Sequence, residues 1–231
     1  PSMFMLLQKE EYACDGSIML TASHLPFNKN GLKFFVKEGG LESSDVGEGI
    51  NIAYEGKFRE GKGEVAEHPF MDEYCADLVA LLRKATGDET PLKGKRIIVD
   101  AGNGAGGFYA TKVLEPLGAN VDGSQFLDPD GNFPNHIPNP ENKAAMESIC
   151  KAVIDNKADF GIIFDTDVDR AGAVGKTGEE INRNRLIALI SAILLEETPG
   201  ATIVTDSVTS DGLAEFIERK GGKHLRFKRG Y

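Results

Sequence analysis

The sequence contains no tryptophan, only three cysteines and no long hydrophobic run. Cys14, Cys75 and Cys150 are widely spaced and odd in number, and they match neither a zinc finger nor a disulfide framework. This use of cysteine favours a reducing compartment, and we expect a cytoplasmic protein. No apolar stretch approaches the roughly 20 residues that would span a bilayer, which argues against insertion into a membrane.

Positive charge is scarce: 26 Lys and Arg stand against 36 Asp and Glu, for a formal net charge of -10. A protein of this sign repels nucleic acid and has no general attraction for anionic lipid. An anionic small molecule would therefore need a local positive site. The hydrophobic fraction of 41% is sufficient for a sizeable core, in one large domain or two small ones.

The two ends of the chain suggest a piece of a longer protein. The sequence begins at Pro1 without an initiator methionine or a signal-peptide pattern, and it stops at Tyr231 just after a strand-like run at 224–227. We expect truncation at both ends, so a targeting segment of the parent protein would lie outside this sequence.

Short apolar runs alternate with amphipathic stretches, which predicts an α/β fold. We expect a helix from Pro69 to a stop at Gly87, with an apolar face made of Phe70, Tyr74, Leu78 and Leu82, and a second helix through Val113 and Leu117. Three further helices are expected to have apolar faces made of Met146, Ile149 and Val153; of Leu186, Ile190 and Leu194; and of Leu213, Phe216 and Ile217. Segment 39–64 has little apolar content and predicts an irregular surface connection. The predicted strands are 17–20, 32–36, 96–100, 119–121, 160–164, 202–205 and 224–227.

The segment 21–33, TASHLPFNKNGLK, is a glycine- and proline-punctuated loop between two predicted strands. An isolated serine in such a loop most often satisfies its own turn. Here, however, Ser23 is accompanied by the imidazole of His24 and the amine of Lys33. A serine that accepts and returns phosphate needs a nearby acid or base, and as phosphoserine it needs a cation to neutralise its charge.

Three carboxylates at alternate positions, Asp165, Asp167 and Asp169, follow a predicted buried strand and precede Arg170. Open α/β sheets usually bind ligands at the carboxyl ends of their strands. Like charges this close repel unless a cation or an arginine offsets them, so the pattern favours a hard divalent cation facing a phosphate. An EF-hand loop is excluded, because it requires Gly and Glu where this sequence has Arg170 and Lys176.

The glycine-rich segment 102–107, GNGAGG, supports a competing hypothesis. It follows a predicted strand, precedes a predicted helix and has Asp122 about twenty residues beyond Gly102, as a dinucleotide-binding fingerprint requires. When this segment is considered without the other motifs, a tight turn between a strand and a helix explains it equally well. We interpret His68 and His136 as surface or capping residues, because no Cys or His partner lies at metal-binding spacing.

The order and separation of TASHLP, Asn30-Gly31, Lys33 and Asp165-x-Asp-x-Asp-Arg170 resemble the α-D-phosphohexomutase family of phosphoglucomutases and phosphomannomutases. The resemblance extends through PLKGKRIIVDAGNG and covers essentially the whole chain. It implies consecutive α/β domains with mixed, largely parallel sheets flanked by helices. The implied parts are 1–88, the end of a first domain with the phosphoserine loop; 91–178, a second domain with the metal loop; and 179–231, the start of a third.

The resemblance also implies a role for each candidate residue. Ser23 would be the phosphorylated serine, with His24 and Lys33 as acid, base and phosphate-contacting groups. Arg170 would contact phosphate. The magnesium ligands would be Asp165, Asp167, Asp169 and, through its phosphate, Ser23. The implied activity is that of an isomerase of carbohydrate metabolism, which moves a phosphoryl group between C1 and C6 of a hexose monophosphate through a hexose bisphosphate.

Two positions depart from the family pattern. Leu25 stands where the family often has Asn, and Thr166 stands where the metal loop often has Gly. The choice among glucose, mannose and amino sugars, like the oligomeric state, stays open. Two alternatives are a nucleotide-dependent oxidoreductase using 102–107 and a non-catalytic sugar-phosphate-binding module. Because the last domains are absent, we expect these 231 residues alone to have little or no mutase activity.

Overall fold

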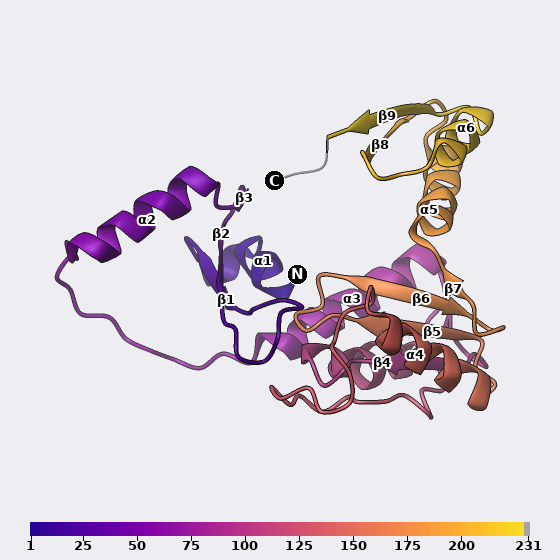
Figure 1. Ribbon diagram of the computed structural model, residues 1–231, viewed down its shortest axis with the longest axis horizontal. Helices are drawn as coiled ribbons and strands as arrows, with labels where there is room; N and C mark the ends of the chain where they lie inside the picture. The colour runs from indigo at the N-terminus through magenta and orange to yellow at the C-terminus, as the bar shows by residue number, and fades with distance from the viewer. Residues whose placement is uncertain (229–231) are drawn as a thin grey trace. The chain divides into compact units, whose positions relative to one another are not determined.

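The computed structural model describes residues 1–228 and divides into two compact units, Pro1–Glu179 and Glu180–Tyr231 (Figure 1). Positions 229–231, the end of the third predicted part, lie outside the described residues. Helices flank sheets with both parallel and antiparallel pairings, so the predicted α/β class with mixed sheets is confirmed. Among the described residues, no helix is both long and apolar enough to cross a bilayer.

The first unit opens with an antiparallel sheet that holds segment 21–33, which we call the serine loop. Strand β1 (Ser17–Leu20) pairs with β2 (Leu32–Val36), as predicted, and β2 pairs with β3 (Gly39–Gly40). Helix α1 (Ser2–Leu7) and a 3-10 turn (Glu10–Tyr12) precede this sheet. The pairing of Leu20 with Leu32 closes the base of the serine loop, which therefore projects from a fixed hairpin.

The irregular connection predicted for 39–64 is wrong in its first half, where α2 (Ser43–Glu55) forms. Glu42 and Asp45 build a capping box that satisfies amide donors at the helix start, and Gly56 ends the helix with a φ of 65°. Hydrophobic periodicity could not predict α2, because none of its residues is buried.

Helix α3 (Phe70–Thr86) begins after Pro69 and ends at Gly87, whose φ is 67°, as predicted. Its buried face differs from the prediction: Phe70, Cys75 and Val79 are buried, whereas Leu82 is exposed. This stripe packs against Val113 and Leu117 of the following segment.

A central sheet contains β4 (Ile97–Asp100), β5 (Phe160–Phe164) and β6 (Ala171–Gly175) as neighbours in that order. Strands β4 and β5 are parallel, and β5 and β6 form an antiparallel hairpin. Helix α4 (Lys143–Asp155) covers one face, where its predicted stripe packs in the core. That core includes Met146, Ile149 and Val153 of α4 and Ile98, Ile163 and Val174 of the strands.

The segment through Val113 and Leu117 is not the α-helix that we predicted. It is a π-helix (Tyr109–Leu114) between two 3-10 turns, Ala105–Gly107 and Glu115–Leu117. Pro116 lacks the amide hydrogen that a continuing helix would use. The predicted strand at 119–121 is reduced to a single bridge between Arg96 and Asn120.

In the second unit, β8 (Thr202–Asp206) and β9 (Lys223–Phe227) pair in parallel. The other elements are β7 (Glu180–Ile181), α5 (Arg183–Glu197) and α6 (Asp211–Arg219). The core contains Leu195, Leu213 and Ile217. The predicted apolar stripe of α5 is wrong, because its buried residues are Ser191 and Leu195 and not Ile190 or Leu194.

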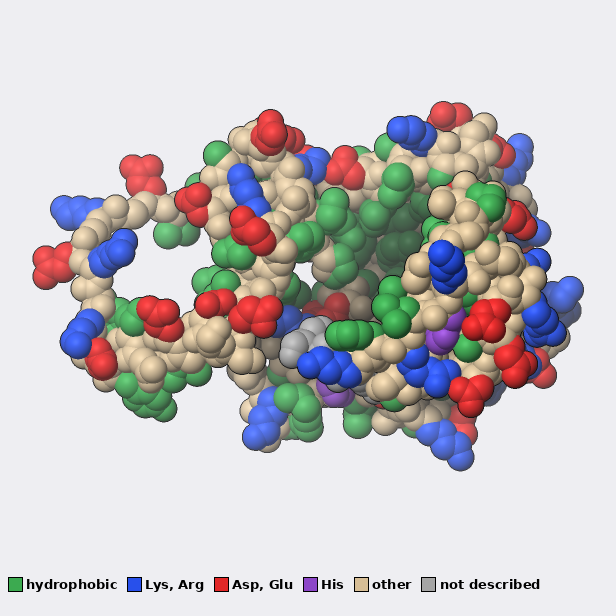
Figure 2. All heavy atoms as spheres, turned by 90° about the horizontal axis from the view of Figure 1, so that it is seen from above, with side chains coloured by type: hydrophobic (Ala, Val, Ile, Leu, Met, Phe, Trp, Pro, Cys, Tyr) green, Lys and Arg blue, Asp and Glu red, His purple; other side chains and the backbone are tan. Residues whose placement is uncertain are grey.

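Acidic and basic side chains are interspersed over the face of the molecule in Figure 2. Neither sign of charge forms a broad continuous patch on that face.

Gly161 of β5 tests the close approach of α4 to the sheet. A Cβ at this position would lie 2.5 Å from Cγ2 of Val153 and 3.2 Å from Cγ1 of Ile149. We expect Gly161→Ala to lower the free energy of unfolding by about 1–3 kcal/mol in urea titrations, as overpacked cores do. Gly49→Ala in the exposed helix α2, where a Cβ meets nothing within 4 Å, is the control and should cost nothing. Equal stability of the two variants would contradict this packing.

Candidate functional site

The serine loop holds Ser23 in a conformation that few non-glycine residues adopt, with a φ of 54°. Thr21 fixes it through Oγ1, which accepts a hydrogen bond from the Ser23 amide at 2.8 Å. The Thr21 amide in turn donates to the Gly31 carbonyl at 3.0 Å. Gly31 must lack a side chain, because a Cβ would lie 2.7 Å from the Thr21 carbonyl oxygen. The two sides of the loop thus close tightly and present the serine hydroxyl.

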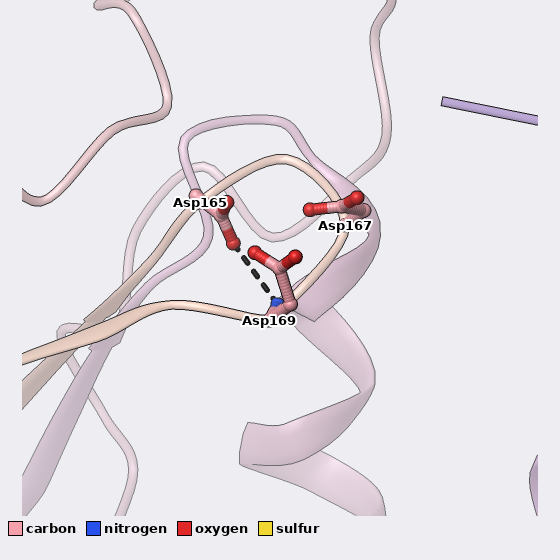
Figure 3. A group of neighbouring side chains, drawn as sticks. All are labelled: Asp165, Asp167 and Asp169. Atoms are coloured by element: carbon pink, nitrogen blue, oxygen red, sulfur yellow. Dashed lines mark hydrogen bonds between the residues drawn. The ribbon is translucent and has the colours of Figure 1, made fainter. Parts of the chain in front are cut away.

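The acidic loop is the turn of the β5–β6 hairpin. Asp165 directly follows β5, and its Oδ1 accepts hydrogen bonds from the amides of Asp169 at 3.1 Å and Arg170 at 3.0 Å. These contacts wrap the loop around the buried Asp165 carboxylate. Figure 3 shows the carboxylates of Asp165, Asp167 and Asp169 pointing toward a common space, and their potential ligand atoms all lie within 4.8 Å of one another.

The serine loop and the acidic loop are far apart in the sequence, and their side chains contact each other directly. Arg170 Nη2 donates to Ser23 Oγ at 2.7 Å and also contacts His24 Nδ1, which lies 3.3 Å from the same hydroxyl. Lys33 Nζ donates to Asp167 Oδ2 at 2.7 Å and to Asp169 Oδ2 at 2.8 Å. The structure therefore brings together every residue that the sequence nominated: Ser23, His24, Lys33, Asp165, Asp167, Asp169 and Arg170.

Burial and the crowding of negative charge shift the pKa values of Asp165, Asp169 and Lys33. Burial, together with the nearby charges of Asp167 and Asp169, raises the pKa of Asp165 to about 7. Burial also opposes ionisation of Asp169, but the hydrogen bonds with Lys33 and Asp165 and the positive charges of Lys33 and Arg170 together outweigh it and lower the pKa of Asp169. Burial alone would lower the pKa of Lys33, yet its hydrogen bonds to the two aspartates raise it. Lys33 is therefore held as a cation between them.

The acidic loop fits a divalent cation. Asp165 Oδ2 and Asp167 Oδ1 are buried and accept no hydrogen bond from any residue in 1–228. The guanidinium of Arg170 offsets part of this charge, with Nε 3.5 Å from Asp165 Oδ2 and 3.6 Å from Asp169 Oδ1. Buried polar atoms normally have a partner, and carboxylate oxygens are the ligands that hard divalent cations prefer. The residues present could thus hold a metal ion.

A cavity of about 330 Å³ opens beside Ser23. It is lined by the serine loop, including Leu25 and Phe27, and by Asn103, Asp130 and Thr166 from the loops of the central sheet. This volume falls at the small end of the range typical of ligand sites.

The glycine-rich segment 102–107 does not have the geometry of a nucleotide site. A Cβ on Gly104 would lie 2.8 Å from the Thr166 backbone, and one on Gly107 would collide with the Leu127 carbonyl. These glycines make room for protein and not for a pyrophosphate. The segment also leads into a 3-10 turn and a π-helix, without the α-helix N-terminus that the dinucleotide fingerprint uses.

Sequence reasoning missed a buried pair next to this segment. We interpreted His136 as a surface or capping residue, but its side chain is only 5% exposed, and Nε2 lies 3.0 Å from both carboxylate oxygens of Asp100. The search for Cys or His at metal spacing overlooked a carboxylate partner. A charged residue at the end of an all-apolar strand was the available signal.

Comparisons with known proteins identify similar sequences for most of the chain. Residues 1–59 match the family model "Phosphoglucomutase/phosphomannomutase, alpha/beta/alpha domain I", and residues 72–178 match that of domain II. A phosphomannomutase/phosphoglucomutase of Pseudomonas putida is 33% identical over 93% of this chain and 44% of its own length. A phosphoglucomutase of Neisseria meningitidis serogroup B is 34% identical over 94% of this chain and 46% of its own length.

A solved structure is also similar. The crystal structure of a phosphoglucomutase/phosphomannomutase family protein from Burkholderia thailandensis superposes with a TM-score of 0.83 and 31% identity, over 94% of this chain and 45% of that one. The chain thus spans a little under half the length of these relatives.

Lys33 and a divalent cation would share the same two carboxylates, which makes a direct prediction. Removing the lysine charge in Lys33→Met should strengthen binding of Mn²⁺ by this chain, on the order of tenfold, because a competing cation is lost. Electron paramagnetic resonance of free Mn²⁺ measures the affinity. Lys37→Met, at an exposed position just after the same strand, should leave it unchanged. Weaker binding by Lys33→Met would show that the lysine supports the ligand arrangement instead.

Proposed function

Because the chain belongs to the phosphoglucomutase/phosphomannomutase family, we propose that it carries the phosphoryl-transfer centre of a hexose-phosphate mutase. One observation carries the proposal: Arg170 of the acidic loop donates a hydrogen bond to the hydroxyl of Ser23, 147 positions away. A serine held by a guanidinium beside three carboxylates is suited to carry a phosphate that needs both a cation and a donor.

Each side chain takes a part in handling that phosphate. Ser23 Oγ is the atom that is phosphorylated, and Arg170 binds phosphate oxygens with its planar donors. His24, whose Nδ1 lies 3.3 Å from Ser23 Oγ, is placed to take or return a proton at the serine oxygen. Lys33, held as a cation by Asp167 and Asp169, is suited to contact phosphate or to give a proton to a sugar oxygen. It could act as a base only after losing those partners.

Asp165, Asp167 and Asp169 would hold Mg²⁺, with the phosphate on Ser23 as a further ligand. When bound, the ion neutralises charge that develops on the transferring phosphoryl group. Two buried carboxylate oxygens without a hydrogen-bond partner within 1–228 support this assignment.

The reaction proceeds in two transfers. A hydroxyl of a hexose monophosphate attacks the phosphorus on Ser23; the Ser23 Oγ–P bond breaks, a sugar O–P bond forms, and the hydroxyl proton passes to a base. The sugar bisphosphate then reorients and returns its other phosphate to Ser23 by the reverse steps. The net result moves a phosphoryl group between C1 and C6 and restores the enzyme.

We assign residues 1–88 to the end of the first domain, 91–178 to the second and 179–231 to the start of a third. The domain I model matches 1–59 and the domain II model matches 72–178, so most of helix α3 (Phe70–Thr86) falls in the second match although this assignment gives it to the first domain. The division between compact units at Glu179 supports the third part. The sparse and widely spaced cysteines of the sequence, Cys14, Cys75 and Cys150, support a cytoplasmic location.

Replacement of the serine tests the proposed function. In a protein extended to the length of the relatives, Ser23→Ala should abolish both phosphorylation by a hexose bisphosphate and turnover of glucose 1-phosphate and mannose 1-phosphate, because no other group can carry the phosphoryl intermediate. Mass spectrometry and a coupled assay measure the two effects. Ser44→Ala, in the exposed helix α2, should change neither. Substantial residual turnover by Ser23→Ala would reject the mechanism.

The alternatives have their own outcomes. Binding of a nicotinamide cofactor at micromolar concentration would favour an oxidoreductase that uses 102–107. Binding of a sugar phosphate without turnover by the extended protein would favour a non-catalytic module.

The chain by itself should bind Mg²⁺ but show little or no mutase activity, because it spans under half of its relatives' length. Calorimetric titration with Mg²⁺ and the same coupled assay on the 231 residues check both statements. Brisk turnover by this chain would show that the remaining domains are dispensable.

A further inference from the structure

Asp100, the last residue of β4, is fully buried, and its carboxylate collects several donors. The Gly102 amide donates to Oδ1 at 2.9 Å and Gln125 Nε2 donates to Oδ2 at 2.6 Å. His136 Nε2 lies 3.0 Å from both oxygens. These donors hold the buried carboxylate in one orientation.

The surroundings of His136 favour a cation. One ring nitrogen, Nδ1, lies 3.0 Å from the Ile137 carbonyl oxygen, and the other faces the Asp100 carboxylate. Both neighbours only accept hydrogen bonds, so both ring nitrogens must carry protons. Burial by itself would lower the pKa of His136, but the hydrogen bond and charge of Asp100 and the hydrogen bond to the Ile137 carbonyl together raise it.

This ion pair connects to the acidic loop through the glycine-rich segment. Gly102 has a φ of 54° and packs on His136, since a Cβ there would lie 3.0 Å from the imidazole Cε1. Two residues on, Gly104 packs directly on the backbone of Thr166. The Ala105 amide then donates to the Thr166 carbonyl at 2.8 Å. Thr166 stands between the first two aspartates of the acidic loop.

We propose that the Asp100–His136 ion pair is a positioning device for the acidic loop, acting through residues 102–105 on Thr166. The pair holds the turn at 102–105, and the turn fixes Thr166 through the contacts of Gly104 and Ala105, which sets the spacing of Asp165 and Asp167. The proposal rests on the metal site of the proposed function. Neither residue touches the reacting groups, so both act through the loop that they hold.

Metal affinity of the chain tests the proposal. His136→Gln retains one donor but removes the charge and the second contact, and Asp100→Asn removes the negative partner. We expect each single variant to weaken Mn²⁺ binding at least tenfold, and the double variant, in which two neutral amides can pair, to recover part of the loss. Unchanged Mn²⁺ affinity in His136→Gln would overturn the proposal.

A matched control separates positioning from general stability. Leu117→Ala removes a fully buried side chain from the separate core that contains Cys75 and Val79 of α3, and should lower Tm by as much as the pair variants. It should leave the Mn²⁺ affinity unchanged. An equal loss of affinity in Leu117→Ala would show that the pair acts only through global stability.

Nuclear magnetic resonance of the unmodified chain gives a test that requires no folded variant. At neutral pH, the ¹⁵N shifts of His136 should be those of a doubly protonated ring. Titration with Mg²⁺ should then shift the amide resonances of Gly104 and Ala105 and the ring of His136, and leave Gly49 in helix α2 unchanged. A neutral ring, or resonances of 102–105 that ignore Mg²⁺, would refute the coupling.

The extended protein separates this proposal from the proposed function. In His136→Gln, activity should require at least tenfold more Mg²⁺ and recover at saturating Mg²⁺. Failure of Ser23→Ala to abolish turnover would reject the mutase mechanism, yet the Mn²⁺ affinities of the pair variants would still decide the positioning role.

Discussion

The candidate site depends on keeping oxygen atoms of three carboxylates, two buried and one exposed, within 4.8 Å of one another. The molecule offsets that repulsion from three directions. Backbone amides of the hairpin bind Asp165, the ammonium of Lys33 bridges the other two, and the guanidinium of Arg170 lies at the edge of the cluster. Both cations also reach the serine loop: Lys33 is the last residue of segment 21–33, and Arg170 donates a hydrogen bond to Ser23. The same charge that destabilises the acidic loop therefore joins the two loops together.

Sequence patterns predicted the parts of the fold where burial decides the structure. Strand 160–164 and the stripe of α4 lie in a core, so hydrophobic periodicity describes them correctly. Strands 17–20 and 32–36 were also predicted, although Ile18, Leu20 and Leu32 are exposed. The failures occur where burial is absent or where local geometry prevails. Helix α2 buries nothing, α5 buries a serine, and the segment around Pro116 adopts π and 3-10 turns.

Some predictions for the candidate site were also right and others wrong. The sequence nominated Ser23 and the acidic residues by chemistry and order, and the family resemblance that they carried is confirmed. The glycine-rich segment misled because glycine makes room equally for a pyrophosphate and for another stretch of backbone, and only the contact of Gly104 with Thr166 decides between them. The charge of Asp100 at the end of β4 marked one member of the buried pair, but its partner could not be predicted, because His136 lies on a loop that returns 36 positions later.

The distance along the chain between the two loops has a consequence for assembly. The acidic loop is local to one hairpin, whereas the contact of Arg170 with Ser23 closes a loop of 147 positions and Lys33 with Asp169 closes one of 136. Loop closure of this size costs entropy that a few polar contacts repay only after both sheets have formed. The acidic hairpin can therefore mature early, while its junction with the serine loop is a late event in folding. Formation of the contact between Arg170 and Ser23 would then report that the entire first unit has reached its native topology.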